Sequence, residues 1–238
     1  MYTKVYIYIH KKIVISMHYT KFQDIIDGLL SRGIHTVSVN ELAKLLDKPR
    51  NYASLLARKN KRLHRIENGK YALVGADIFE IASNIVNPSY VSLFSAIRYY
   101  NLTNQIPISI EVITIRRHRL LKTEGYTIKF INFKKERFFG YTRIGNTYIA
   151  TAEKAIIDSL YLNTVPYDEV KGALTEGIEK GLIKLDTLKR YAIHMNSKMV
   201  IGRILLLLNT LDIDTNGLKQ LTPKNKVSIL GMRGVHHD

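Results

Sequence analysis

Apolar and polar residues follow a helical period in the first third of the chain. Ser38 and Glu41 have the spacing of a capping box, in which the hydroxyl caps the first turn and the glutamate reaches back to the backbone. The apolar residues that follow share one helical face: Val39, Leu42, Leu45 and Leu46. The pattern therefore predicts a short amphipathic helix that begins after Ser38.

A second helix is predicted to begin at Pro49, because proline has no N–H to lose in a first helical turn. Its apolar side chains are expected to face a core: Tyr52, Leu55 and Leu56. Its polar side chains are expected to face the other way: Asn51, Ser54 and Arg58. The two helices together predict a helix-turn-helix.

A strand, a turn and a second strand are predicted over residues 63–74. Asn68-Gly69 is a favoured two-residue hairpin turn, in which both central positions need a positive φ. Upstream, an apolar stripe predicts a supporting helix with a capping box at Thr20 and an end at Gly33. The stripe consists of Phe22, Ile25, Ile26, Leu29 and Leu30. These elements predict a winged helix-turn-helix over residues 17–75.

Residues 1–16 are predicted to form a β-rich N-terminal extension, as two short strands or one interrupted strand. Met17 follows this segment directly, so one interpretation is a misassigned start codon, with residues 1–16 an extension that is either dispensable or paired as an edge strand. Basic residues and a histidine interrupt its apolar run, so no signal peptide is expected and the protein is expected to be cytoplasmic.

Residues 76–238 are predicted to form an α+β domain with a small sheet and a helical C-terminal part. The expected strands are 110–116, 126–133, 141–144 and 147–150, with Gly145-Asn146 as a turn and a further short strand at Val227–Leu230. The expected helices are 77–86, 92–100, 152–162, 167–180, 186–194 and 199–211, with Ser92, Thr151 and Asp186 as N-caps. The fold class expected for the whole chain is α+β.

The number and distribution of charged residues indicate a class of function. The chain of 238 residues has 36 Lys and Arg against 20 Asp and Glu, a formal net charge of +16. Over half of that excess lies in residues 1–75, which hold 14 basic and 5 acidic side chains. Such a basic excess is typical of nucleic-acid binding, whereas no run of about 20 apolar residues indicates a membrane span.

The predicted second helix and hairpin carry the candidate DNA-binding residues. Arginine reads guanine edges and asparagine reads adenine edges in the major groove, so the expected base-reading residues are Arg50, Asn51, Ser54 and Arg58. The expected phosphate-binding residues are Lys59, Lys61, Arg62, Arg65 and Lys70. The alternative is that these residues form an ordinary solvated face.

Candidate catalytic and metal sites are weak by comparison. There is no Cys, and the eight His residues show no ligand spacing, so neither a metal nor a cofactor is expected. Lys154 and Asp158 have the spacing of an intrahelical pair, and with Glu153 they are interpreted as helix-start and packing residues. Asp212 and Asp214 resemble the paired carboxylates of nucleotidyltransferases but lack the upstream Gly-Ser turn. The chain is therefore not expected to be an enzyme.

Four segments resemble the C-terminal domain of AbiEi-type antitoxins, which belong to type IV toxin–antitoxin and abortive-infection systems. They are residues 90–102, residues 113–114, Phe138-Phe139-Gly140-Tyr141, and residues 149–158. The last is the most specific, although this chain has Ala152 where the family often has proline. The resemblance covers roughly residues 20–165. It implies a repressor of its own operon that binds operator DNA, and whose C-terminal region neutralises a nucleotidyltransferase-like toxin.

A second basic cluster, Arg116, Arg117, His118 and Arg119, follows one of the predicted strands. It is interpreted as a contact to flanking DNA, as a contact to an acidic face of the toxin, or as solubilising charge. Two further functions stay open for the whole chain. One is a winged-helix regulator with a ligand-sensing C-terminal domain, and the other is a nucleic-acid-processing enzyme that uses the winged helix as a clamp. The oligomeric state is open.

Overall fold

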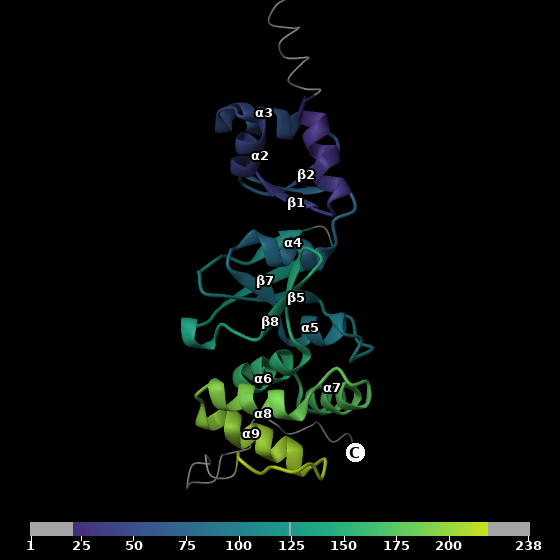
Figure 1. The fold of residues 1–238 in the computed structure, drawn as a ribbon, viewed down its shortest axis with the longest axis vertical. Coiled ribbons are helices and arrows are strands. Elements are labelled where there is room, and N and C mark those ends of the chain that lie inside the picture. The colour runs from purple at the N-terminus through teal and green to yellow at the C-terminus, as the bar shows by residue number, and fades with distance from the viewer. Residues whose placement is uncertain (1–20, 124, 219–238) are drawn as a thin grey trace, which may run out of the picture. The chain divides into compact units, whose positions relative to one another are not determined.

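The structure, a computed structural model, describes residues 21–123 and 125–218 (Figure 1). The strands predicted in residues 1–16, the cap at Thr20 and the strand at Val227–Leu230 lie outside the described residues. The chain divides into two units, Met1–Ile81 and Ala82–Asp238, and helix α4 (Ile78–Ile85) contains the division. Each unit is described by itself below.

The first unit contains a three-stranded antiparallel sheet and helices that cover it. Residues 21–31 are helical, and Gly33 follows with a φ of +67°, as predicted. The remaining elements are β1 (Thr36–Ser38), α2 (Val39–Leu46), α3 (Arg50–Lys59), β2 (Leu63–Glu67) and β3 (Lys70–Leu73). The strand order is β1-β3-β2, so the last strand of the hairpin is central.

Local hydrogen bonds explain where α2 begins. The Glu41 N–H donates to Ser38 Oγ over 3.2 Å, and the Ser38 N–H donates to Glu41 Oε2 over 2.7 Å. Both halves of the predicted capping box are therefore confirmed, and they satisfy two amide groups that the helix itself leaves unpaired. At α3, Pro49 is the N-cap rather than the first helical residue.

Two leucines that were predicted to face the core are exposed. The buried residues of α2 are Val39, Leu42 and Leu46, and those of α3 are Ala53, Leu56 and Ala57. Leu45 is 49% exposed and Leu55 is 48% exposed. Each residue of an α-helix is rotated by about 100° from the last, so a face centred on these buried positions turns Leu45 and Leu55 outwards.

The predicted Asn68-Gly69 turn is present, but its geometry differs from the prediction. Gly69 has a φ of +79°, whereas Asn68 does not have a positive φ. The register of β2 against β3 shifts between Arg65 and Glu67. An extra residue in one strand changes the turn that closes the hairpin, so a positive φ at one position suffices.

The second unit is a six-stranded mixed sheet with helices packed on it. Its elements are β4 (Ser89–Val91), α5 (Leu93–Tyr99), β5 (Ser109–Thr114), β6 (Leu121–Thr123), β7 (Tyr126–Asn132), the 3-10 helix η1 (Lys135–Arg137), β8 (Tyr141–Ile144), β9 (Thr147–Ala150), α6 (Ala152–Leu162), α7 (Tyr167–Glu179), α8 (Leu185–His194) and α9 (Lys198–Asn209). The strand order is β6-β7-β5-β4-β9-β8. The described chain is thus a mixed α+β protein.

Helix α6 is central to the packing of the second unit. It contacts α5, α7, α8 and α9, and the last three gather around it (Figure 1). The predicted cap is confirmed, because Thr151 Oγ1 accepts a hydrogen bond from the Lys154 N–H. Ser92 is the N-cap of α5, as predicted, but its hydroxyl makes no capping bond and donates to Asp158 instead. The predicted cap at Asp186 is wrong, because Lys184 is the N-cap of α8 and Asp186 lies in its first turn.

Candidate functional site

The outward face of α3 forms a hollow in the surface of the first unit. Its volume is about 560 Å³, and its lining residues are Arg50, Asn51, Ser54, Leu55 and Arg58. Four of the five are the residues that were predicted to read bases. They share a face because positions three, four and seven residues apart lie above one another on a helix.

Arg50 is held in place at one end of this hollow. Its Nε donates to Asn40 Oδ1 over 3.0 Å, and a Cβ added at Gly69 would lie 3.1 Å from its Nη2. The Gly69 carbonyl in turn accepts a hydrogen bond of 2.9 Å from the Val39 N–H. Arg50 is therefore bonded to the start of α2 and lies close to the turn of the hairpin.

The predicted phosphate-binding residues fall into two groups. Three of them have partners within the unit. The Arg62 guanidinium lies 2.7 Å from Asp27, Arg65 Nε donates to the Glu67 carbonyl over 3.3 Å, and Lys70 Nζ lies 3.9 Å from Glu67. The others, Lys59 and Lys61, are exposed and form no ion pair with any residue of the described chain.

Lys70 is the most enclosed of these cations. Burial lowers the pKa of its ammonium group, and the nearby carboxylates of Glu67 and Glu41 act in the opposite direction. The side chain is partly buried beside the hairpin. The ammonium group of Lys70 therefore lies next to a carboxylate of the hairpin. The side chains of Arg58, Lys59 and Lys61, in contrast, are exposed to solvent.

The second basic cluster lies in the other unit. Arg116, Arg117 and Arg119 are exposed in the loop between β5 and β6, and His118 packs its ring 4.5 Å from the ring of Phe130. The Arg116 N–H donates to Thr114 Oγ1 over 3.1 Å, which fixes the start of the loop. The cluster is thus a loop with three outward guanidinium groups.

Sequence reasoning missed two residues at this site: Leu55, which lies on the α3 face, and Asn40 of α2, which accepts a hydrogen bond from Arg50. A helical projection anchored on Ala53 and Ala57 would have found Leu55, because two small residues four positions apart mark a close-packed face. No sequence signal points to Asn40, since its contact with Arg50 depends on how α2 and α3 pack.

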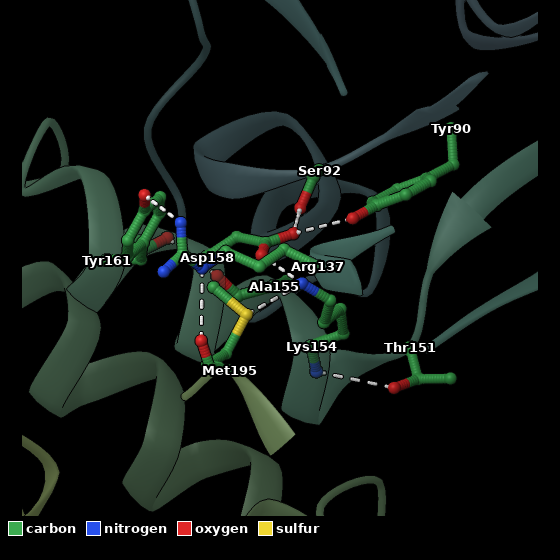
Figure 2. A network of polar contacts seen from close by, with 10 residues as sticks. Tyr90, Ser92, Arg137, Thr151, Lys154, Ala155, Asp158, Tyr161 and Met195 are labelled. Atoms are coloured by element: carbon green, nitrogen blue, oxygen red, sulfur yellow. Dashed lines mark hydrogen bonds and ion pairs between the residues drawn. The ribbon is translucent and has the colours of Figure 1, made fainter. Parts of the chain in front are cut away.

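A buried charge pair lies in the second unit (Figure 2). The Lys154 ammonium donates to Asp158 Oδ1, so the predicted intrahelical pair is confirmed, and both side chains have no solvent exposure. The other oxygen of Asp158 accepts hydrogen bonds from Ser92 Oγ, at 2.8 Å, and from the Tyr90 hydroxyl, at 3.2 Å. The pair therefore ties α6 to β4 and to the start of α5.

Aromatic rings and a second cation surround this pair. Lys154 Nζ lies 4.4 Å from the ring centre of Phe139 and 5.4 Å from that of Phe133. Arg137 donates to the Met195 carbonyl and to the Tyr161 hydroxyl, at 3.0 and 2.8 Å. Cations over ring faces are stabilised by the ring quadrupole, which offsets part of the cost of burying the ammonium group.

Burial dominates the protonation of the pair. It raises the pKa of the Asp158 carboxyl and lowers the pKa of the Lys154 ammonium group, and in each case the charge of the partner acts against it. Burial also raises the pKa of Tyr90, and the Asp158 charge adds to that effect. Because the atoms of the pair are closed to solvent, the arrangement fits a structural cross-link between elements.

Across residues 21–123 and 125–218, no three His, Cys, Asp or Glu side chains are grouped so that they could hold a metal ion. Within the same ranges, no helix combines the length and the apolar character that crossing a bilayer requires.

The chain matches no known protein-family profile, and no curated protein is significantly similar to it in sequence. Among solved structures, it resembles the crystal structure of the RV2827C protein from Mycobacterium tuberculosis. The two share a TM-score of 0.56 and 12% sequence identity, over 87% of this chain and 83% of that one. At this identity the similarity shows a common fold.

Proposed function

We propose that the chain binds duplex DNA through a winged helix-turn-helix formed by its first unit. In this proposal α3 is the recognition helix, which enters the major groove, and the β2–β3 hairpin is the wing, which follows the phosphate backbone. One observation carries the proposal. Arg50, Asn51, Ser54 and Arg58 line one hollow on the outward face of α3.

The chemistry of this face matches the edges of base pairs. Arginine pairs with the two acceptors of guanine, and asparagine pairs with the donor and acceptor of adenine. Lys59 and Lys61 flank the face and supply charge for phosphate groups. In this proposal, some side chains contact bases and determine the sequence specificity of DNA binding, and others contact phosphate groups and increase its affinity.

The second part of the proposal rests on the resemblance to AbiEi-type antitoxins. The protein acts as the repressor of its own operon, and its second unit neutralises a nucleotidyltransferase-like toxin. The most specific motif of that resemblance, residues 149–158, runs from β9 through the Thr151 cap into α6. It contains the Lys154–Asp158 pair, which ties α6 to β4 and to the start of α5.

A titration of the full chain with duplex DNA tests the DNA-binding part. A sequence selected from a random pool should bind with a steep dependence on salt, because each phosphate contact releases counterions. Arg58→Ala should weaken binding to the selected sequence by about 1–3 kcal/mol, and Lys61→Ala should weaken all sequences alike. Lys198→Ala, the same loss of charge on an exposed lysine of the second unit, is the control. Wild-type protein without duplex binding would refute the proposal.

Growth of cells that express the partner toxin tests the antitoxin part. The full chain should rescue growth, and Arg58→Ala should derepress the operon while rescue persists, because the operator-binding face belongs to the first unit. A folded Arg58→Ala protein that derepresses and also fails to rescue would contradict this division of roles.

A further inference from the structure

Leu55 is an apolar side chain in the centre of a polar face. It lies on α3 between Asn51, four residues earlier, and Arg58, three residues later, and all three line the same hollow. It is 48% exposed, and the core of the unit is built from other residues of α3, namely Ala53, Leu56 and Ala57. Packing within the unit therefore does not account for a leucine at this position.

The major groove offers one apolar feature to such a side chain. Thymine carries a C5-methyl group there, whereas the other edges of the four base pairs present donors and acceptors. Apolar side chains that contact this methyl group exclude water from both surfaces. Leu55 lies between Asn51, a side chain that can pair with adenine, and Arg58, a side chain that can pair with guanine. A leucine at this position is suited to contact the methyl group of a thymine.

We propose that Leu55 determines specificity by contacting the C5-methyl group of a thymine in the bound duplex. This inference rests on the proposed DNA binding through α3. It adds that the recognised site contains a thymine next to the bases that Asn51 and Arg58 contact. The partner is duplex DNA because the surrounding side chains, Arg50, Arg58 and the neighbouring Lys59, are cationic and exposed.

The experiment replaces thymine by deoxyuridine, which lacks only the methyl group. The full chain is titrated by fluorescence anisotropy against its selected duplex and against duplexes in which each thymine is replaced in turn. One replacement should weaken wild-type binding about fourfold, the change expected for one buried carbon. Leu55→Ala should bind the thymine and deoxyuridine forms of that duplex equally.

Leu45→Ala is the matched control, because Leu45 has a nearly identical exposure, 49%, but lies on α2. This variant should keep the wild-type ratio between the two duplexes. Circular dichroism of both variants checks that they are folded, since neither leucine belongs to the core of the unit.

The outcomes separate the two proposals. Wild-type protein that binds the duplex with a steep salt dependence, but tolerates every thymine replacement, would overturn the role of Leu55 and leave the DNA binding intact. Leu55→Ala protein that keeps the wild-type ratio would overturn it as well. Wild-type protein that binds no duplex would overturn the proposed function and this inference together.

Discussion

The guanidinium Nε of Arg50 donates a 3.0 Å hydrogen bond to the side-chain oxygen of Asn40. Arg50 is the first residue of α3, and Asn40 lies in the first turn of α2, so the bond links the two helices at the edge of the α3 face. The bond fixes a long side chain before any ligand arrives. A fixed arginine loses less conformational entropy on binding than a free one.

Asn40→Ala should therefore weaken duplex binding without unfolding the protein. The expected loss is about 1 kcal/mol, which is the typical cost of ordering one long side chain on binding. A double-mutant cycle with Arg50→Ala is the measurement, by anisotropy titration of all four proteins. In the Arg50→Ala background the loss should disappear, and an undiminished loss there would show that Asn40 acts on its own.

Gly69→Ala should lower the free energy of unfolding by about 1–2 kcal/mol, because the φ of +79° is costly for a residue with a Cβ. The new Cβ would also approach Arg50 Nη2 at 3.1 Å, and the end of that flexible side chain would shift. Denaturant unfolding measures the effect. Gly69→Asn is the control and should lose less stability, since asparagine tolerates this region, whereas equal losses would contradict the backbone explanation.

Lys154→Met should destabilise the second unit by about 3–5 kcal/mol, because it leaves the Asp158 carboxylate buried without its cation. Adding Asp158→Asn should restore much of the loss, since the amide oxygen can still accept from Ser92 and Tyr90. Denaturant unfolding followed by circular dichroism compares the three proteins. A double variant as unstable as Lys154→Met would show that shape, and not charge, matters at this site.

Tyr100 should make stability dependent on pH above about pH 10. Burial raises the pKa of its hydroxyl from 10.0 to about 12, and the hydroxyl donates to the Ala150 carbonyl over 2.9 Å. The unfolded chain releases this proton at a lower pH than the folded chain does, so the stabilisation is complete below pH 10 and is lost as the pH rises toward 12. Relative to Tyr100→Phe, the wild-type protein should lose stability over that interval only. A difference between the two proteins that is constant from pH 8 to pH 11 would contradict the assignment.

Features that depend on neighbouring residues could be predicted from the sequence. The caps at Ser38 and Thr151 are set within three or four positions, and so is the turn at Gly145-Asn146, where Ile144 pairs with Thr147. The limits of β8, β9 and α6 agree with the prediction for the same reason. Propensity and hydrogen bonding act locally at these points.

Features that depend on distant partners could not be predicted. β4 and β6 are strands of three residues, too short for a visible alternation, and β4 exists because it pairs with β5 on one side and β9 on the other. The α3 face was predicted except for Leu55, because the predicted apolar face was anchored on the large side chains and not on the buried Ala53 and Ala57. The contact between Asn40 and Arg50 depends on the crossing of two helices.

The pairing of β4 with β9 has a consequence for synthesis on the ribosome. Val91 pairs with Ile149 in a parallel ladder, and α5 together with β5 to β8 lies between the two strands in the sequence. The sheet of the second unit cannot be completed until β9, which ends at Ala150, has left the exit tunnel. The described strands of the first unit, in contrast, have all been synthesised once Leu73 has been added. Vectorial synthesis and the slow formation of non-local pairs therefore favour a sequential order, in which the first unit folds while the second is still being translated.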